Sequence, residues 1–394
     1  MPARRSVLAG SATLCAGSLA GCLGSRPFSS STDSFEVSTE WPRVEYDSAA
    51  TGQQPDVTGP VEDPAIRWDV EVPVDDGYVP ATLVVDETVV VAGGSTVTAL
   101  EADGSQAWQT ELFDAELAAD GRGYYCSAAA DDDHVFVGTH HGLFALERDG
   151  DVEWSHEVDS DPGSSGVFRS PAVIDDTVYF CTAEEREVCA YTTDGDERWC
   201  VSLEEPIIGG PAVHDGRVYV GDDAGLHAFL TDGDADWSID IGQVRETPAA
   251  TDQTVYAASM TGSGHTLAEV SGETGDERWE TSAPSVSGPP TVVDTDSMTE
   301  LAVPSWHGTV FLYDRQDGTP NWGVPIGDSA PGRPVFPVAD EQRVYATSRG
   351  HLACIEPRSD RIWDLEVDGG NGTIALVDGA LFVTTTGGHC YAVT

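Results

Sequence analysis

The sequence predicts an all-β protein, an eight-bladed propeller of four-stranded antiparallel sheets. The prediction depends on three observations. An Asp-Gly turn lies just upstream of five recurring tryptophans, with the aspartate five residues before each one. Short apolar runs fill the spaces between such turns, and none has helical periodicity. The tryptophans themselves recur at intervals of 38–46 residues, as Trp68, Trp108, Trp154, Trp199, Trp237, Trp279, Trp322 and Trp363. A period of about 40–45 residues with four strands is typical of a propeller blade.

Residues 210–237 show one complete unit. Three apolar runs, 211–213, 218–220 and 226–229, are separated by turns rich in aspartate and glycine, and a fourth strand carries Trp237. Short apolar runs joined by such turns are strands connected by hairpins. Each unit is therefore one antiparallel sheet, and the units begin at about residue 64.

The two ends of the repeat array complement each other. After Trp363, the segments 374–377, 380–384 and 389–393 predict three strands, and no tryptophan strand follows them. At the start, residues 66–72 predict a tryptophan strand that no other strands precede. Pairing the two ends completes an eighth blade and removes the exposed sheet edges of a linear array. We therefore expect the N-terminal strand to join the C-terminal blade.

The eight recurring tryptophans are interpreted as structural. A buried indole contributes a large apolar area and one N–H that needs an acceptor. Because the same residue occupies the same place in every unit, we expect it to pack between adjacent blades. A ligand site built on any one of these tryptophans is not expected.

The charge of the chain is strongly acidic. The formal net charge is −49, and all 19 basic residues are arginine. The acidic residues are spread over all units, which favours adaptation to a salt-rich medium where screening is strong. An acidic tail would need a localised block. Nucleic-acid binding is disfavoured because there is no basic patch to neutralise phosphates.

The first 63 residues have a different composition from the repeats. In residues 1–22, Arg4-Arg5 precede a short apolar stretch, which resembles a twin-arginine export signal, and Leu19-Ala20-Gly21-Cys22 resembles a lipidation site at Cys22. The alternatives are a plain cleaved signal or an uncleaved N-terminal anchor. Residues 23–63 are rich in Ser, Pro and Gly and predict a tether. Within them, 41–52 predicts an ordered island at the propeller rim or closure, or a single adhesive tryptophan in a disordered tether.

The repeat A-(L/F)-x-x-x-D-G-x-x-x-W resembles that of the PQQ-like, quinoprotein-dehydrogenase-type propellers, over residues 64–394. The resemblance implies one of two branches. Quinoprotein dehydrogenases bind pyrroloquinoline quinone (PQQ) and calcium in the central channel. The other branch comprises lipid-anchored propellers similar to the outer-membrane assembly lipoprotein, and cell-surface propellers of salt-loving archaea. This chain lacks the adjacent Cys-Cys pair of the enzymes, so no catalytic residue is transferred.

Candidate site residues are few. Asp294, Asp296 and Glu300 resemble part of a calcium loop, or form an acidic hairpin. Cys181 and Cys189 flank a turn and are a candidate cross-strand disulfide, with buried thiols as the alternative. Aligning the first strands of the units places Arg169, Arg245, Glu246 and Arg333 near the channel mouth, where they would hold an anion or pair with neighbouring acids. Asn371 begins a glycosylation sequon or an unmodified turn.

The function expected from the sequence is that of an exported, lipid-anchored, monomeric propeller. It would act as a non-catalytic binding or scaffold protein for other cell-surface or membrane proteins, with no cofactor. The alternatives are a PQQ- and calcium-dependent dehydrogenase-like oxidoreductase and a small-anion sensor. The shape of the central channel distinguishes these functions, because a sealed channel would leave only surface binding.

Overall fold

The computed structural model describes residues 37–76, 78–113, 124–125, 127–158, 169–183, 185–295, 298–327, 336–356 and 361–394. All of these residues belong to one compact unit. Every helix or strand assigned within these ranges is a β-strand. No helix in the same ranges is long and apolar enough to cross a membrane.

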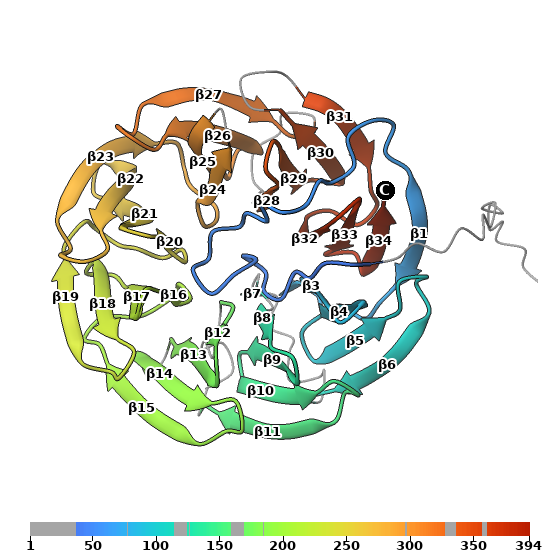
Figure 1. The fold of residues 1–394 in the computed structure, drawn as a ribbon, viewed down its shortest axis with the longest axis horizontal. Helices are drawn as coiled ribbons and strands as arrows, with labels where there is room; N and C mark the ends of the chain where they lie inside the picture. Colours follow the sequence, from blue (N-terminus) through green and yellow to red (C-terminus); the bar gives the residue numbers. More distant parts are fainter. Residues whose placement is uncertain are drawn as a thin grey trace, which may run out of the picture. The chain divides into compact units, whose positions relative to one another are not determined.

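Eight four-stranded antiparallel sheets form a closed ring, which confirms the predicted fold (Figure 1). Blade 1 contains β3 (Ala81–Val85), β4 (Thr88–Ala92), β5 (Thr96–Leu100) and β6 (Gln106–Glu111). Blade 2 contains β8 (Ser127–Ala130), β9 (His134–Thr139), β10 (Gly142–Glu147) and β11 (Val152–Glu157). Blade 3 contains β12 (Ala172–Ile174), β13 (Thr177–Thr182), β14 (Glu187–Thr192) and β15 (Glu197–Ser202). Blade 4 contains β16 (Ala212–His214), β17 (Arg217–Gly221), β18 (Leu226–Leu230) and β19 (Ala235–Ile239).

The remaining blades follow the same plan. Blade 5 contains β20 (Ala249–Thr251), β21 (Thr254–Thr261), β22 (Gly264–Ser271) and β23 (Glu277–Ala283). Blade 6 contains β24 (Thr291–Thr295), β25 (Met298–Ser305), β26 (Thr309–Asp314) and β27 (Pro320–Pro325). Blade 7 contains β28 (Phe336–Ala339), β29 (Val344–Ser348), β30 (His351–Ile355) and β31 (Arg361–Glu366). Outside the blades, β2 (Tyr78–Val79) and β7 (Tyr124–Tyr125) form a short parallel pair.

Blade 8 closes the ring as the sequence predicts. It combines β32 (Gly372–Val377), β33 (Ala380–Thr385) and β34 (His389–Val393) with the N-terminal β1 (Ile66–Glu71). The register runs from Ile66 opposite Val393 to Glu71 opposite His389. β1 is the outermost strand of this blade, so each of the eight blades has four strands.

Six of the eight recurring tryptophans join one blade to the next by an indole hydrogen bond. Trp108 of blade 1 donates its indole N–H to the carbonyl of Arg148, in the last turn of blade 2, at 2.8 Å. Gly150 in that turn has φ +94°, and a Cβ there would lie 2.6 Å from the Trp108 ring. Only glycine satisfies both requirements. The same bond joins Trp68, Trp154, Trp199, Trp237 and Trp279 to the following blade. These tryptophans are therefore structural, as expected.

The hydrophobic core is divided among the interfaces between blades. A typical cluster packs Leu83 and Val97 of blade 1 against Val137 and Leu146 of blade 2. Outermost strands alternate exposed and half-buried residues, as in β11 and β31. Inner strands are buried on both faces, which explains their continuous apolar runs. This arrangement leaves the inner edges of the first strands facing the central channel.

Residues 41–58, which we call the strap, cross the centre of the ring (blue in Figure 1). The sequence predicted that 23–63 is a tether with an ordered island at the rim or closure. For the described residues 37–63 the tether prediction is wrong: Val37, Trp41, Ala50 and Val57 are buried in the core of the propeller. The propeller therefore includes residues well before position 64, and the ordered island lies at the channel instead of the rim.

Candidate functional site: the central channel

The strap closes the channel by supplying acceptors to the inner edges of the blades. The amides of Val213, Ala250, Val292 and Ala339 donate to strap carbonyls at 2.6–2.9 Å. These amides belong to the first strands of blades 4, 5, 6 and 7, whose inner edges have no neighbouring strand. An unpaired buried N–H is costly, so a segment that runs around the channel and accepts these bonds stabilises the ring. The acceptors on the strap are Ser48, Ala49, Thr51 and Gly52.

The other four blades also contact the strap. Trp41 exchanges two backbone hydrogen bonds with Val84 of blade 1, and the amide of Ala130 in blade 2 donates to Pro42. The amide of Gly379 in blade 8 donates to Thr58 at 2.8 Å. Blade 3 is reached by a side chain, that of Arg43. The strap therefore touches all eight blades in a single pass.

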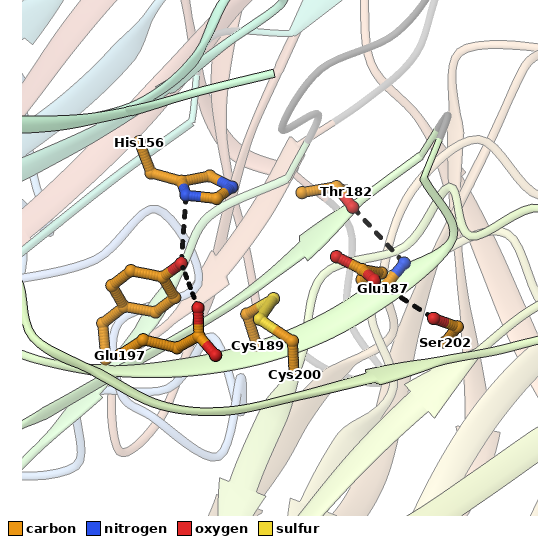
Figure 2. The surroundings of a disulfide bond; sticks show 8 residues. His156, Thr182, Glu187, Cys189, Glu197, Cys200 and Ser202 are labelled. Carbon is orange, nitrogen blue, oxygen red and sulfur yellow. Dashed lines mark hydrogen bonds between the residues drawn. A yellow bond between two sulfur atoms is a disulfide. The ribbon is translucent and has the colours of Figure 1, made fainter. Parts of the chain in front are cut away.

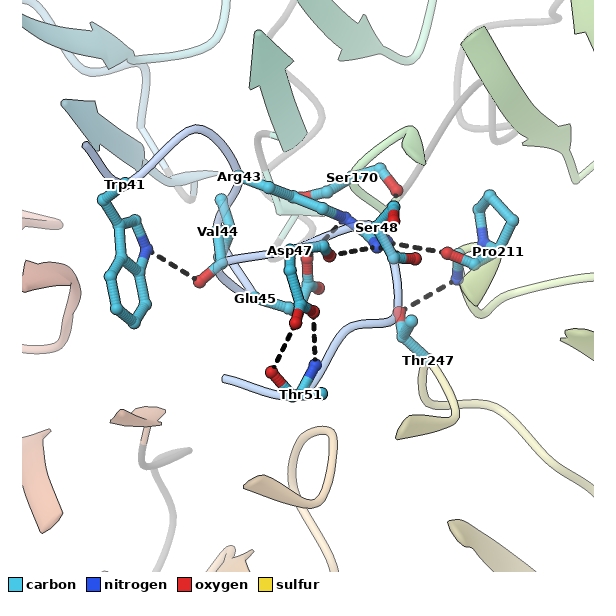
Figure 3. Close-up of polar contacts among 11 residues, drawn as sticks. Trp41, Arg43, Val44, Glu45, Asp47, Ser48, Thr51, Ser170, Pro211 and Thr247 are labelled. Atoms are coloured by element: carbon cyan, nitrogen blue, oxygen red, sulfur yellow. Dashed lines mark hydrogen bonds and ion pairs between the residues drawn. The ribbon is translucent and has the colours of Figure 1, made fainter. Parts of the chain in front are cut away.

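Arg43 lies at the centre of this arrangement (Figure 3). Its side chain is 2% exposed. One terminal nitrogen donates to the carbonyls of Asp47 and Ser48 within the strap, at 3.0 and 3.1 Å. The other donates to the carbonyls of Ser170, just before β12, and Pro211, just before β16, at 3.0 and 2.7 Å. The planar guanidinium thus fixes the strap to blades 3 and 4.

Acidic side chains balance the charge of Arg43. Nε of Arg43 lies 3.2 Å from Oε2 of Glu45, an ion-pair contact without hydrogen-bond geometry. Burial lowers the pKa of Arg43, and the charges of Glu45 and Asp47 oppose this shift. Burial raises the pKa of the Asp47 carboxyl, against hydrogen bonds from the amide and hydroxyl of Thr51. The strap therefore carries its own counter-charges into the channel.

Two predicted channel-mouth residues do lie at the channel, and they bind each other. Nη2 of Arg169 is 2.6 Å from Oε2 of Glu246. Burial raises the pKa of Glu246, and Arg169 opposes that shift. Arg245 instead forms a two-pronged pair with Asp223 at 2.9 and 3.0 Å. Arg333 lies outside the described residues. Of the two predicted alternatives, pairing with neighbouring acids is the one found for Arg169 and Arg245.

Little space remains beneath the strap. A cavity of about 40 Å³ lies between strap residues Glu45 and Gly52 and the inner ends of the first strands. Its lining includes Ser127, Ser170, Pro289 and Thr373, which lie in or just before the first strands of their blades. Small-molecule sites in proteins typically have about 300–1,000 Å³. The cavity formed by the described residues accommodates a few water molecules.

The predicted calcium site is not assembled. Glu300 lies opposite Val293 across the β24–β25 pair, so the two side chains share one face of the sheet. Asp294 follows Val293 in the strand and therefore points to the other face. Glu300 is buried and accepts a hydrogen bond from the Asn321 amide at 3.0 Å, whereas Asp294 pairs with Arg315 at 2.9 Å. Asp296 lies outside the described residues. Asp294 and Glu300 therefore do not share an ion, and the calcium prediction is wrong for this pair.

The predicted disulfide is also wrong, because the register differs by one residue. Cys189 lies opposite Phe180 on β13, and Cys181 lies opposite Val188. Adjacent positions point to opposite faces, so Cys181 and Cys189 face away from each other. Cys189 instead lies directly opposite Cys200 on β15 and is bonded to it (Figure 2). Cys181 is a buried free thiol.

The remaining sequence predictions concern the chain surface and its start. Asn371 is 1% exposed, and its side-chain carbonyl accepts a hydrogen bond from the Arg349 amide at 2.8 Å. This burial favours the alternative of an unmodified residue before β32, and glycosylation of Asn371 stays a prediction. The export signal and the Cys22 lipidation site lie outside the described residues. Arg43 was missed, because an arginine in a Ser- and Pro-rich stretch gives no periodic signal.

Fold and channel together define a class: PQQ-like propellers with a closed ring of eight blades. The particular family follows from the sequence itself. A family model described as "Outer membrane protein assembly factor BamB" matches residues 60–194 and 184–394, and the chain belongs to this family.

Solved structures with this fold come from different functional classes. BamB from Moraxella catarrhalis superposes with a TM-score of 0.65 and 19% identity, covering 84% of this chain and all of that one. Quinohemoprotein alcohol dehydrogenase from Comamonas testosteroni gives 0.70 and 13%, covering 90% of this chain and 80% of that one. The computationally designed Ika8 protein gives 0.63 and 12%, covering 82% of this chain and 99% of that one. At these identities the likeness shows the fold alone.

A curated relative shares part of the repeat array. The serine/threonine-protein kinase AfsK of Streptomyces griseus is 34% identical over 148 residues, which is 34% of this chain and 18% of that protein. The chain therefore spans about a fifth of the length of this relative.

The described channel residues do not fit PQQ. The strap occupies the position over the channel, and the cavity of about 40 Å³ is far smaller than a tricyclic quinone with its carboxylates requires. Arg169 is already bound to Glu246. No two cysteines are adjacent in the sequence. No catalytic step through a quinone is therefore derived for this chain.

Proposed function

We propose that this protein is a lipid-anchored, extracellular, non-catalytic propeller that binds other membrane or cell-surface proteins or serves as their scaffold. The observation that supports it most is the sealed channel mouth. The strap engages all eight blades, and the described residues leave about 40 Å³ beneath it, which favours ligand binding at the outer surface. The family description, an outer membrane protein assembly factor, supports a role in contact with other proteins.

The two alternative functions expected from the sequence have weaker support. A PQQ-dependent oxidoreductase needs a space that the strap fills. A small-anion sensor needs a channel arginine that is available to the anion. Arg43 is paired with the buried carboxylate of Glu45, and Arg169 is paired with the partly buried carboxylate of Glu246.

Cross-linking in membranes tests the proposal. The full chain is produced in salt-matched cells, the membranes are treated with a short carboxyl-reactive cross-linker, and linked peptides are identified by mass spectrometry. We expect reproducible links from exposed acidic residues of the blades to one or a few other membrane or surface proteins. Abundant chain with intramolecular links alone would contradict the proposal.

A thermal-shift measurement tests the oxidoreductase alternative. A cofactor that binds the native state raises the unfolding temperature by mass action. We expect saturating PQQ with calcium to leave the unfolding temperature of the full chain unchanged relative to calcium alone. A concentration-dependent rise would overturn the non-catalytic assignment.

A further inference from the structure

We propose that Cys189 and Cys200, once reduced, form with Glu187 a binding site for a thiophilic divalent cation such as Zn²⁺. In this proposal the disulfide and the metal exclude each other, so the oxidation state of the pair controls binding. The site lies in blade 3, away from the channel, and it is independent of the proposed scaffold function.

The strand register brings the three groups together. Cys189 on β14 lies opposite Cys200 on β15, and Glu187 lies two residues before Cys189, opposite Ser202. Positions two apart on a strand share a face, as do directly opposite residues. The two sulfurs and a Glu187 carboxylate oxygen lie within 4.8 Å of one another. In the part of the chain that the structure describes, this is the set of three or more Cys, His, Asp or Glu side chains that lie close enough together to hold a metal ion.

The third ligand is held in position by its neighbours (Figure 2). The Ser202 hydroxyl donates to Oε1 of Glu187 at 3.1 Å. The amide of Glu187 donates to Oγ1 of Thr182 at 3.3 Å, which fixes the start of β14. Such outer contacts orient a ligating carboxylate. One carboxylate oxygen, Oε2, is left for a metal.

Reduction of the Cys189–Cys200 disulfide and binding of the metal are two separate, balanced reactions. A dithiol reductant transfers two electrons and two protons to the disulfide, giving two thiols and a cyclic disulfide of the reductant. Binding then displaces both thiol protons, because thiolates are the ligands. Two thiolates and one carboxylate suit Zn²⁺ and leave one position for water.

Access and selectivity also favour this pair. β15 is the outermost strand of blade 3. Cys189 is buried, but Cys200 is only partly buried, so a small dithiol would reach the disulfide at the Cys200 sulfur. The other described cysteines, Cys181, Cys354 and Cys390, are buried. Burial raises the pKa of Cys354 and of Cys390 to about 12, which keeps them as thiols. Cys181 faces the other side of the sheet.

Cobalt absorption tests the site directly. The full chain is reduced with excess dithiol, the reductant is removed anaerobically, and Co²⁺ is titrated while thiolate-to-cobalt charge transfer is recorded. We expect about one equivalent of Co²⁺ bound, displaced by Zn²⁺, with no signal from the oxidised chain. No charge-transfer band in the reduced chain would overturn the proposal.

Variants assign the ligands. Cys189→Ser and Cys200→Ser should abolish the band, and Glu187→Gln should weaken cobalt binding by roughly 10–100-fold or more, since loss of even an outer partner costs that much. Glu197→Gln on the same face, and Cys390→Ser, are matched controls that should bind as the wild type does. A band that survives Cys189→Ser, or an unchanged affinity in Glu187→Gln, would contradict the assignment. Far-ultraviolet circular dichroism checks that each variant is folded.

Discussion

Single glycines next to the tryptophans illustrate how the repeat constrains this chain residue by residue. Gly150 and its counterparts Gly104, Gly195 and Gly233 have positive φ and lie against an indole of the preceding blade. Gly216 also has positive φ, +74°, but a Cβ there would meet nothing within 4 Å. These positions separate the cost of backbone conformation from the cost of crowding.

Replacing Gly150 with alanine should destabilise the protein more than replacing Gly216. Both changes force alanine into the left-handed region, at roughly 1–2 kcal/mol. Gly150→Ala additionally places a methyl 2.6 Å from Trp108, which should add about 1–3 kcal/mol for overpacking. Denaturant unfolding at constant salt measures both. Equal losses in the two variants would show that the indole moves away without cost.

Replacing Arg43 should lower the stability far more than replacing the partly exposed Arg245. Arg43→Met removes donors to four backbone carbonyls and leaves Glu45 buried without its partner, which should destabilise by about 3–5 kcal/mol. Arg245→Met breaks a partly exposed pair with Asp223 and should cost about 0–1 kcal/mol. The same unfolding assay compares them, and similar values for both would refute the central role of Arg43.

At the level of elements, the strap supplies hydrogen-bond acceptors to the amides on the inner edges of the first strands, which have no neighbouring strand. First strands pair with second strands on one side only, and their inner edges face the channel. Here a single irregular segment accepts from Val213, Ala250, Val292 and Ala339. An edge that is covered in this way does not need charged or bulged residues to protect it.

Disrupting the strap should therefore expose specific amides. We expect a chain whose residues 41–58 are replaced by a Gly-Ser linker of equal length to keep its ring, because β1 still pairs with β34. The amides of Val213, Ala250, Val292 and Ala339 should exchange with deuterium much faster, while the amides within β17 and β21 keep their protection. Hydrogen exchange with mass spectrometry measures this. Unchanged exchange at the four amides would mean that the strap does not protect them.

At the level of the whole molecule, charge dominates the expected response to solvent. The formal net charge of −49 on the 394-residue chain opposes folding through self-repulsion. The screening length falls from about 10 Å at 0.1 M salt to about 3 Å at 1 M. The unfolding temperature should therefore rise steeply over this range of sodium chloride. An equal rise in sucrose at constant low salt would attribute the effect to exclusion of solutes in general.

The repeat made most of the fold predictable from sequence. Eight copies average out local ambiguity, so blade number, the structural tryptophans and the pairing of 66–71 with the last blade follow from spacing. The strap does not repeat, and its contacts are backbone hydrogen bonds that any sequence can make. The predicted Cys181–Cys189 disulfide required a register between β13 and β14 that differs by one residue from the observed register. Strands that are apolar on both faces do not determine this register. Burial of Asn371 likewise depends on tertiary contacts.

The pairing of β1 with β34 also has a consequence for synthesis. The side chains of Asp69 and His389 are hydrogen-bonded across this pair at 2.9 Å, and the two residues are 320 positions apart in the chain. At about 5–20 residues per second, β1 leaves the ribosome roughly 15–60 s before its partner exists. During that interval the first strand has no sheet to join, and blade 8 cannot form until residues 389–393 have been synthesised. Any machinery that recognises the start of this chain therefore meets it before the ring can close.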